Sequence, residues 1–475
     1  MLTRLRVRGF KNLLNVDVRF GPFTCVAGPN GVGKSNLFDA IHFLHLLTKN
    51  QVMEAVQKIR DASGRSADPS ALFSAFGKFR SPEMRFITDL VVDRRVQDDF
   101  GVGAEAAISS LRYEVAFALE EQDGVQRLKL VHESLVPIPV LSARKDIGFP
   151  AKKEFKETSI AGRRTKPFIS TETSGASTEI TVHQEGHGGR KLPATNSSRT
   201  VIGGLASSEF PTILAVHREM ESWKTLLLEP SSMRAPSLYR DPRMVDARGG
   251  NLPAAIHRLE RLEDRPGRVR ATIANQLARL LDDVHELRLR SDDKTETWTV
   301  EVRGRDGIFH PARSLSDGTL RFLVLTVLGL DPEAKGMICL EEPENGIHPQ
   351  RIQAMVDLLR GIAVDPEYPI DGENALRQVV INTHSPLVVN HVRQDELVYL
   401  CDEWVTRDGQ SGRVAAVRVP PNSWRANVPD APTQVARGDL VDYLGNAADG
   451  WLAMTYHESS NGEPAEVHPG NGRVQ

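Results

Sequence analysis

The sequence predicts an α/β protein: a parallel, doubly wound sheet with an antiparallel β lobe and a helical lobe, and no long coiled coil. A short apolar run, Phe23 to Ala27, leads through a glycine-rich loop into a helical stretch from Lys34 to Leu47, and such a strand–loop–helix unit is typical of these sheets. From residue 311 onward, short apolar strands alternate with helices, as in a parallel sheet covered by helices. Three longer runs between these parts predict the antiparallel lobe: residues 84–92, 111–119 and 128–135.

The first twenty residues predict a β-hairpin. Leu5 and Val7, and then Val16 and Val18, alternate with polar residues, as the residues of half-buried strands do. The segment from Gly9 to Asn12 is expected to form the turn. We therefore expect one antiparallel strand pair before the glycine-rich loop.

Weaker signals occupy the middle of the chain. Residues 144–200 are polar and rich in Ser, Thr, Gly, Lys and Arg, and we interpret them as a long, partly disordered surface insertion. Residues 252–263 and 267–285 predict helices, the second with one apolar face, and residues 287–289 and 298–302 predict a strand pair. No heptad pattern persists over three or four repeats, so we expect no long coiled-coil arm.

The C-terminal third carries the clearest alternation of elements. Helices are predicted at 320–330 and 351–362, and strands at 337–340, 379–381, 397–401 and 414–419. The predicted division of the chain is a core of residues 1–48 and 311–405, an antiparallel subdomain of residues 49–143, the insertion at 144–200, a helical lid subdomain of residues 201–310 and a C-terminal extension of residues 406–475.

Composition argues against several classes of protein. The 475 residues are 40% hydrophobic and 25% charged, with 59 Lys and Arg against 62 Asp and Glu, so a nucleic-acid contact needs a local basic patch. The three cysteines, Cys25, Cys339 and Cys401, form no C-x-x-C pair, which argues against a disulfide framework or a zinc site. No signal peptide and no run of about 18–20 apolar residues occurs, so we expect a cytoplasmic protein without a membrane partner.

The segment from Gly28 to Ser35 fits the pattern G-x-x-x-x-G-K-S at every fixed position. Its glycines let backbone N–H groups close around phosphate oxygens, and the helix that follows directs its positive end at them. Lys34 is expected to reach the β- and γ-phosphates of ATP, and the Ser35 hydroxyl to bind Mg²⁺. The predicted nucleotide-binding residues are Asn30, Gly31, Gly33, Lys34, Ser35 and Asn36.

Two acids end the apolar strand that runs from Met337 to Leu340. A parallel strand delivers such acids to the edge at which α/β sheets bind ligands. Glu341 is expected to hold the Mg²⁺ ion, and Glu342 is expected to orient or deprotonate the attacking water. Glu342 is therefore the first predicted catalytic residue.

The segment Leu315 to Thr319, L-S-D-G-T, opens an apolar helix, and its Ser316 lies 25 residues before Glu341. With the glycine-rich loop, this segment and the two acids in this order and spacing, the sequence resembles the ABC ATPase superfamily. The signature motif of that superfamily reads L-S-G-G-Q in its best-known form. The variant looks like that of compact bacterial P-loop ATPases related to RecF, SMC proteins and the ATPase half of OLD-family nucleases. The resemblance implies that Ser316, Asp317 and Gly318 act in trans, with Ser316 and Gly318 on the γ-phosphate held by a second subunit.

Two further segments carry the resemblance. Residues 342–349 match the E-P-E-N-G-x-H-P stretch of this group, at the place of the superfamily's D-loop, and residues 382–386 look like its switch-histidine motif. The resemblance therefore implies that His384 contacts the γ-phosphate. The close match covers residues 1–48 and 311–389. The superfamily's lid glutamine has two candidates in this chain, Gln57 and Gln97.

The resemblance implies an ATPase that uses ATP and Mg²⁺ and forms a head-to-tail homodimer or a higher homo-oligomer. By analogy with the group, it acts as a switch on DNA or on a separate effector protein, such as a nuclease, in anti-phage defence. A DNA-repair ATPase of RecF or SMC type is the alternative. A transporter subunit is disfavoured because 280 positions separate Ser35 from Leu315, and a fused Toprim nuclease because no D-x-D occurs in the 91 residues after His384.

Residues 144–166 form a basic strip with eight Lys and Arg against three acids. Such a strip could contact a phosphate backbone, but a solvated loop is the interpretation that we favour. DNA binding therefore stays open from the sequence.

Overall fold

The structure is a computed structural model that describes residues 1–59, 68–122, 124–174, 177–183, 189–193, 197–263, 265, 267–281 and 284–435. Every element described below belongs to one compact unit, Met1–Val435. Most of the predicted extension at 406–475 therefore lies outside the described residues. Within the described residues, no helix is both long and apolar enough to cross a lipid bilayer.

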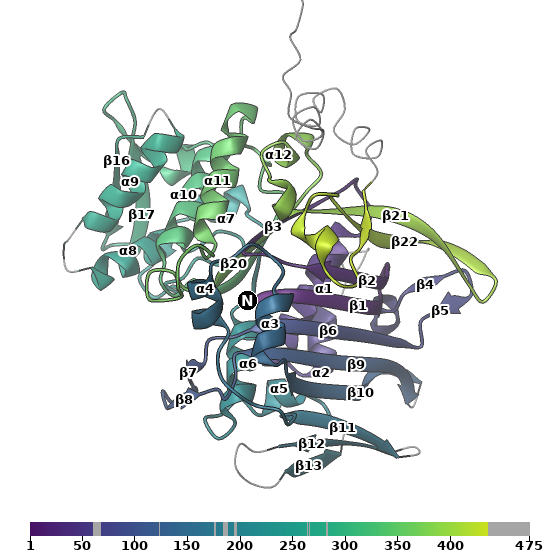
Figure 1. Cartoon of the computed structure of the whole chain (residues 1–475). Helices are drawn as coiled ribbons and strands as arrows, with labels where there is room; N and C mark the ends of the chain where they lie inside the picture. The colour runs from purple at the N-terminus through teal and green to yellow at the C-terminus, as the bar shows by residue number, and fades with distance from the viewer. Residues whose placement is uncertain are drawn as a thin grey trace, which may run out of the picture. The chain divides into compact units, whose positions relative to one another are not determined.

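Seven strands form the sheet that carries the glycine-rich loop (Figure 1). In spatial order they are β14 (Lys224–Leu226), β19 (Gly336–Glu341), β20 (Arg377–Thr383), β3 (Phe23–Ala27), β21 (Leu397–Arg407), β22 (Gln410–Val419) and β23 (Thr433–Gln434). The first five are parallel to one another, β22 is antiparallel to β21, and β23 is parallel to β22. The predicted parallel core is thus confirmed.

A second sheet contains eight antiparallel strands. In spatial order they are β13 (Arg190–Pro193), β12 (Ser177–Val182), β11 (Ile169–Ser174), β10 (Val125–Pro137), β9 (Ser110–Gln122), β6 (Glu83–Val91), β1 (Leu2–Phe10) and β2 (Leu13–Arg19). The predicted N-terminal hairpin and the predicted antiparallel lobe therefore belong to one sheet, because β1 pairs with both β2 and β6. Two short ribbons lie outside this sheet, β4 (Ala75–Phe76) with β5 (Phe79–Arg80) and β7 (Arg95–Gln97) with β8 (Gly103–Glu105).

The helix after the glycine-rich loop, α1 (Lys34–Lys49), packs against both sheets. Phe43 of this helix stacks on Phe10 of β1, with ring centroids 6.2 Å apart. The same hydrophobic core includes Val26 of β3 and Cys339 of β19. A helix buried on nearly every face fixes the end of the loop at Lys34, because neither sheet can shift without disturbing the close packing of this core.

The helical lobe contains a small antiparallel sheet beside its helices (Figure 1). Its helices are α8 (Leu252–Leu262), α9 (Arg268–Leu280), α10 (Asp317–Leu330) and α11 (Ile352–Ile362), and its strands are β15 (Ser237–Leu238), β16 (Glu286–Asp292), β17 (Thr297–Arg303) and β18 (Phe309–Pro311). The predicted helices and the predicted strand pair are confirmed. The helix predicted at 267–285 is too long, because Leu281 already has extended backbone, with φ −136° and ψ 123°.

The segment at 144–200, interpreted from the sequence as a partly disordered surface insertion, forms regular elements over much of its described length. α4 (Lys153–Ser159) buries Phe155, and β11 to β13 extend the antiparallel sheet from β10. Ile169 and Ile180 belong to the main core. β11 and β12 contain few apolar residues, so the alternation by which a half-buried strand is recognised is weak in their sequence. Residues 175–176, 184–188 and 194–196 of this segment lie outside the described residues.

Several elements have no counterpart among the predicted ones. The strand β14 comes from the predicted lid subdomain but pairs with β19 in the parallel sheet, and three residues are too few for a recognisable period. The division of the chain into five segments stays a prediction. The remaining helices are α2 (Val52–Lys58), α3 (Val140–Asp146), α5 (Val201–Gly204), α6 (Pro211–Glu221), α7 (Pro230–Arg234) and α12 (Pro386–Val389).

Candidate nucleotide-binding site

The glycine-rich loop leaves β3 after Ala27 and enters α1 at Lys34. Gly31 and Gly33 have φ angles of 83° and 109°, in the left-handed region that glycine adopts without strain. A Cβ atom on Gly33 would lie 2.5 Å from Oδ1 of Asn12, whereas one on Gly31 would meet no atom within 4 Å. The loop is therefore packed tightly at Gly33 and open at Gly31, where backbone N–H groups can surround an anion.

Lys34 is held by its own loop. Its ammonium group donates hydrogen bonds to the carbonyl oxygens of Gly28 and Pro29, both at 2.7 Å. The side chain is largely buried, and this burial lowers the pKa of Lys34 below its ordinary value, while the nearby Glu342 and Glu344 act in the opposite direction. Phosphate oxygens can take over these bonds, because hydrogen bonds between two charged groups are stronger than those to neutral carbonyls.

Asn12, in the turn of the N-terminal hairpin, forms hydrogen bonds with the glycine-rich loop and with the start of α1. Its Nδ2 donates to the carbonyl oxygen of Val32 at 3.1 Å, and its Oδ1 accepts from Nδ2 of Asn36 at 2.8 Å. The Asn36 side chain is therefore engaged with Asn12, and its predicted contact with nucleotide stays a prediction. Asn12 is missing from the predicted site residues. The signal that could have found it is the turn Gly9–Asn12, which precedes the loop strand in the sequence.

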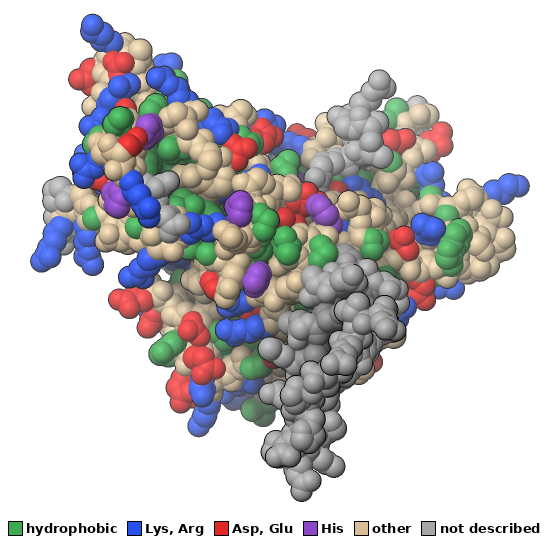
Figure 2. All heavy atoms as spheres, turned by 90° about the horizontal axis from the view of Figure 1, so that it is seen from above, with side chains coloured by type: hydrophobic (Ala, Val, Ile, Leu, Met, Phe, Trp, Pro, Cys, Tyr) green, Lys and Arg blue, Asp and Glu red, His purple; other side chains and the backbone are tan. Residues whose placement is uncertain are grey.

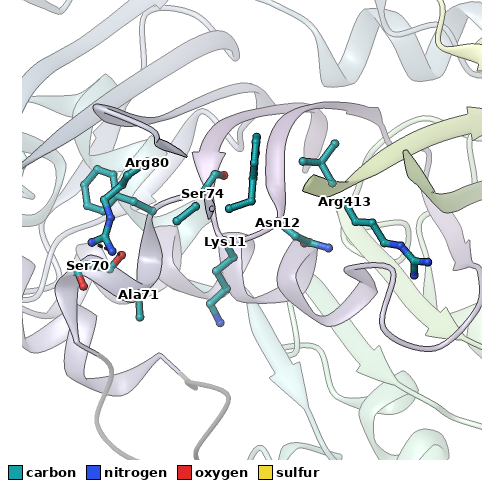
Figure 3. A pocket seen from close by; sticks show the side chains of 11 residues that line it. Lys11, Asn12, Ser70, Ala71, Ser74, Arg80 and Arg413 are labelled. Atoms are coloured by element: carbon teal, nitrogen blue, oxygen red, sulfur yellow. Dashed lines mark hydrogen bonds between the residues drawn. The ribbon is translucent and has the colours of Figure 1, made fainter. Parts of the chain in front are cut away.

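A pocket of about 270 Å³ lies beside Asn12 (Figure 3). Lys11 and Asn12 line it from the hairpin turn, Ser70 and Arg80 from the segment before β6, and Arg413 from β22. These side chains offer amide, hydroxyl and basic groups to the cavity. The cavity therefore adjoins the loop through Asn12 and is polar enough to bind a hydrogen-bonding ligand.

The parallel sheet brings Glu341 to Ser35. Glu341 is the last residue of β19 and pairs in register with Asn382 of β20, and Thr383 of β20 pairs with Ala27 of β3. The strands therefore end at one edge, where the loop begins. There the Ser35 hydroxyl donates to Oε2 of Glu341 at 3.3 Å. This contact joins the two residues that are predicted to bind the metal ion.

The oxygen atoms of Ser35 and Glu341 fit a Mg²⁺ ion. The described residues contain no group of three or more His, Cys, Asp and Glu side chains that could hold a metal. Mg²⁺ does not need such a group, because it prefers oxygen ligands, keeps several waters and is bound through one or two protein ligands together with substrate phosphates. The two neighbouring oxygen donors at the head of α1 match this pattern.

Glu342 follows Glu341 with φ of 44°, which is uncommon for a residue other than glycine. Its backbone N–H donates to both the carbonyl oxygen and Oδ1 of Asn382 at 3.1 Å, and these bonds hold the turn. One carboxylate oxygen accepts from Nδ2 of Asn345 at 2.9 Å, and the other lies 2.9 Å from Nδ1 of His384. The structure therefore places the two residues that are predicted to be catalytic in contact.

Glu344 is a further acid at this edge to which the sequence assigned no role. Its Oε1 accepts from the Thr383 hydroxyl at 2.5 Å. Its Oε2 is buried and has no hydrogen-bond partner among the described residues. Burial raises the pKa of Glu344 above its ordinary value, because a carboxylate loses hydration when it is taken from water.

The predicted signature segment begins α10. The Ser316 hydroxyl caps this helix by accepting from the backbone N–H of Thr319 at 3.2 Å. Asp317, in the first turn, forms an ion pair with Arg234 of α7. Both features are typical of a stable helix N-terminus, and the first turn keeps the partial positive charge that attracts anions.

The signature segment packs against the turn that follows Glu342. A Cβ atom on Gly318 would lie 3.1 Å from the carbonyl oxygen of Gly346, so the two turns approach closely. Within the part of the chain that the structure describes, no hydrogen bond or ion pair joins residues 316–319 to the loop at 28–35. The signature segment therefore neighbours the acidic turn without contacting the loop through polar groups.

The strand ends of the parallel sheet lie on one side of the molecule. In Figure 1, α12 follows β20 closely and lies above the sheet, so Figure 2, seen from above, shows the side on which the strands end. Acidic and histidine side chains lie together near the middle of this view, and Lys and Arg side chains are frequent at its left. The site itself combines the acidic Glu341 and Glu342 with the basic Lys34, as nucleotide sites with a metal do.

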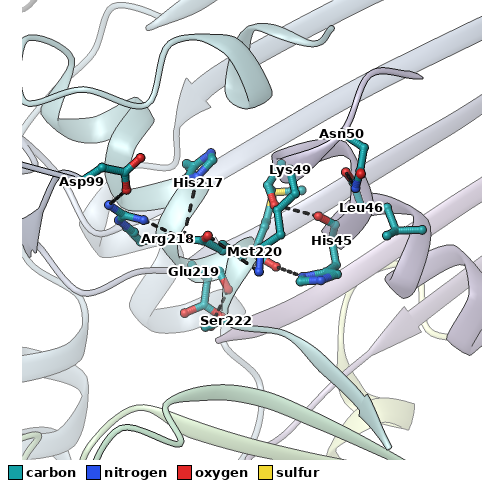
Figure 4. A network of polar contacts seen from close by, with 12 residues as sticks. His45, Leu46, Lys49, Asn50, Asp99, His217, Arg218, Glu219, Met220 and Ser222 are labelled. Carbon is teal, nitrogen blue, oxygen red and sulfur yellow. Dashed lines mark hydrogen bonds and ion pairs between the residues drawn. The ribbon is translucent and has the colours of Figure 1, made fainter. Parts of the chain in front are cut away.

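Neither candidate for the lid glutamine lies near the loop. α1 has 16 residues, so its ends are about 24 Å apart. At the end away from the loop, Lys49 pairs with Glu221 of α6 at 3.7 Å, and Figure 4 shows Lys49 of α1 in one polar network with Arg218 of α6. Gln97 lies at this end, because its carbonyl oxygen accepts from Arg218 of α6 at 3.0 Å, and Gln57 lies in α2, which follows α1. This placement disfavours both.

A family model matches most of the chain. The model described as "AAA domain, putative AbiEii toxin, Type IV TA system" matches residues 23–390, which run from β3 to the segment after His384. Among curated proteins, 45 residues are 49% identical to the DNA replication and repair protein RecF of Parabacteroides distasonis, covering 9% of this chain and 12% of that protein. A further match, 46% over 41 residues, is to the OLD nuclease of Thermus scotoductus, covering 9% of this chain and 8% of that protein.

The chain therefore spans a small part of these two relatives. Among solved structures, the Smc head bound to the C-winged helix domain of ScpA has a TM-score of 0.45 at 13% identity, covering 87% of this chain and 97% of that chain. The Smc head domain with an extended coiled coil, bound to the C-terminal domain of ScpA derived from Pyrococcus furiosus, has a TM-score of 0.41 at 12% identity, covering 87% and 96%.

Proposed function

This chain belongs to that AAA domain family, and from this premise we propose that it is an ABC-type ATPase that hydrolyses ATP, with Mg²⁺, at sites formed between two copies arranged head to tail. The observation that carries the proposal is that, within one chain, the glycine-rich loop and the signature segment are separate. Ser35 contacts Glu341 at the loop, whereas the described residues show no polar contact between the loop and the helix cap at Ser316. A site that uses all these parts needs a second copy.

The start of α10 is suited to a phosphate group carried by that second copy. This helix has 14 residues, and the first backbone N–H groups of a helix attract anions. Ser316 is exposed, so a second molecule can reach it. A two-fold dimer presents the same surfaces twice, and two composite sites would therefore form together.

Each residue of the composite site has a distinct task in this proposal. Lys34 binds the β- and γ-phosphates, and Ser35 and Glu341 hold Mg²⁺, which when bound offsets the negative charge of the phosphates. Glu342 orients the attacking water and accepts its proton, and His384 holds the Glu342 carboxylate in place from 2.9 Å. The pocket beside Asn12 takes the nucleoside part of ATP.

The task of the ATP cycle is proposed from the relatives. The family description names a toxin of a type IV toxin–antitoxin system, and the curated matches are named for DNA repair and for a nuclease. We propose that nucleotide-driven dimerisation switches a separate effector protein, or DNA, in anti-phage defence in the cytoplasm. A DNA-repair ATPase is the second candidate, favoured by the RecF match. Stimulation of ATP hydrolysis by DNA ends or gaps would favour repair, and toxicity on co-expression with a neighbouring nuclease gene would favour defence.

Complementation between two inactive variants tests the composite site. Lys34→Ala removes the phosphate-binding lysine, and Ser316→Glu places a negative charge at the helix cap. Each variant alone is expected to lack ATP hydrolysis. In a mixed dimer, Lys34 of the Ser316→Glu copy and Ser316 of the Lys34→Ala copy form one complete site, and the other site carries both substitutions. If pairing is random, half of the dimers are mixed and each has one working site of two. An equimolar mixture therefore regains roughly a quarter of wild-type turnover.

The same mixture distinguishes the composite site from a site within one chain. If loop and signature act within a single chain, every molecule in the mixture carries one defect, and mixing restores nothing. Thermal unfolding of each variant alone checks that both are folded. Two folded, inactive variants that stay inactive at all mixing ratios would overturn the head-to-tail arrangement.

A further inference from the structure

Arg234 reaches the signature segment from a different part of the parallel sheet. β14 is parallel to β19, so the chain leaves both strands at the same edge. Three residues separate the end of β14 at Leu226 from α7, which runs from Pro230 to Arg234. The strand that the sequence pattern does not predict therefore delivers a guanidinium group to the edge on which the proposed site lies.

Arg234 makes two contacts with the start of α10. Its Nη2 donates to the carbonyl oxygen of Leu315 at 3.1 Å and forms an ion pair with Oδ1 of Asp317. The side chains of Arg234 and Asp317 are 29% and 41% exposed, so a second molecule can reach this pair. Arg234 thus contacts the residues on both sides of the helix cap Ser316, which are Leu315 and Asp317.

A second arginine also connects α10 with the chain around α7, but this side chain comes from α10. Arg321, one turn into α10, donates from Nη2 to the carbonyl oxygen of Leu228 at 3.2 Å and is largely buried. Leu228 lies just before α7. Two arginines, one from each segment, therefore connect α7 with the first turns of α10, and this arrangement holds Arg234 in place beside Asp317.

Asp317 creates an electrostatic problem for the proposed site. A carboxylate in the first turn stabilises a helix, but the proposed function brings the γ-phosphate of a second copy to the same turn. Like charges at such short range repel one another, and the repulsion is strongest where water is excluded. Asp317 therefore needs a permanent positive partner if a triphosphate is to approach Ser316 and Gly318.

We infer that Arg234 is a positioning residue for the composite ATP site: it neutralises Asp317 and orients the signature segment, so that the triphosphate of a second copy can bind there. The inference rests on the proposed function and adds a residue to it. Arg234 acts through Asp317 and not on the reacting atoms. Its loss should weaken the ATP-bound dimer, and removal of the Asp317 charge should make it dispensable.

A charge-rescue experiment in full-length protein tests this inference. The parent carries Glu342→Gln, so that ATP is bound but not hydrolysed, and the dissociation constant of the Mg-ATP dimer is measured by analytical ultracentrifugation. Arg234→Ala is expected to weaken the dimer on the order of tenfold per site, or about 100-fold for two equivalent sites. Adding Asp317→Asn should return the dissociation constant to within about threefold of the parent, since like-charge repulsion is then absent.

Two controls separate charge from folding. Arg248→Ala removes an exposed arginine that pairs with Glu229, the residue before α7, at 3.6 Å, and it should leave the dimer unchanged. Thermal unfolding of each variant reports a defect of packing or folding separately from the effect of charge on the dimer.

The possible outcomes are distinct. A parent that stays monomeric with Mg-ATP overturns the proposed function, and the inference with it. A parent that dimerises while Arg234→Ala dimerises equally well overturns only the inference. If Arg234→Ala dimerises weakly and Asp317→Asn does not rescue it, Arg234 does not act by neutralising Asp317, and the inference is likewise wrong.

Discussion

The Nδ1 atom of His384 lies 2.9 Å from Oε1 of Glu342, although the two residues are 42 positions apart in the chain. Glu342 follows β19, and His384 follows β20. These strands are parallel neighbours in register, and the backbone N–H of Glu342 is bonded to Asn382 of β20. The contact is therefore a consequence of the sheet, and it makes the two side chains a unit whose behaviour can be tested.

Replacing Glu342 by Gln should separate ATP binding from hydrolysis. The amide keeps the size and the hydrogen-bonding capacity of the side chain but cannot accept a proton from water. We expect turnover to fall on the order of 100-fold or more, while ATP affinity stays within a few-fold and a Mg-ATP dimer accumulates. Phosphate release and sedimentation velocity measure the two effects, and equal turnover by variant and wild type would contradict the assignment.

Loss of His384 should not add to the loss of Glu342. His384→Ala is expected to lower turnover on the order of 100-fold, because the carboxylate loses the group that holds it. In a double variant with Glu342→Gln, the further loss should be small, since residues that act as one unit are strongly non-additive. A double-mutant cycle of turnover numbers measures the coupling. Independent, multiplicative losses would show that the contact has no role in hydrolysis.

Asn12→Ala should weaken ATP binding, because the Asn12 side chain holds the glycine-rich loop in place. The change removes two hydrogen bonds, one to Val32 and one from Asn36, each worth about 1 kcal/mol. We expect ATP affinity to fall roughly tenfold, measured by isothermal titration calorimetry. Asn15→Ala, the same change at an exposed position of β2, is the matched control, and an equal effect of both variants would remove Asn12 from the site.

Glu133 should make stability depend on pH. Its carboxylate is fully buried and accepts from the N–H groups of Val201 and Ile202 and from the Tyr113 hydroxyl, and burial raises the pKa of Glu133 to about 7. At pH values between the ordinary carboxyl pKa and about 7, Glu133 has lost its proton in the unfolded chain and still holds it in the folded chain. The free energy of unfolding should therefore fall by about 3 kcal/mol as pH rises through this window, and no further above it.

The variant Glu133→Gln measures this contribution. Because Gln does not titrate, the difference in unfolding free energy between wild type and variant should change by about 3 kcal/mol between pH 5 and pH 8, with the wild type losing stability as pH rises. Urea unfolding at each pH provides the values. Glu120→Gln, an exposed position on β9 paired with Lys129 at 2.8 Å, should change stability by less than about 0.5 kcal/mol at either pH. Parallel curves for wild type and Glu133→Gln would contradict the shift.

The sequence predicted those parts of the site that are contiguous in the chain. Glycines at fixed spacing before Lys34, and two acids after a wholly apolar strand, are local patterns that report backbone conformation and burial directly. The strands and helices of the parallel core could be predicted for the same reason, because each has its own period. The helix from Asp317 to Leu330 likewise follows a visible cap at Ser316.

Contacts between distant segments depended on the tertiary structure. The bond from Asn36 to Asn12 and the ion pair of Arg234 with Asp317 depend on strand order and register, which a local pattern does not encode. The same holds for β11 to β13, whose few apolar residues form a face only when β10 lies beside them. The sequence by itself thus determined which groups we propose to carry the chemistry, and the tertiary structure decided which residues hold them in place, because that choice depends on how sheets and helices meet in space.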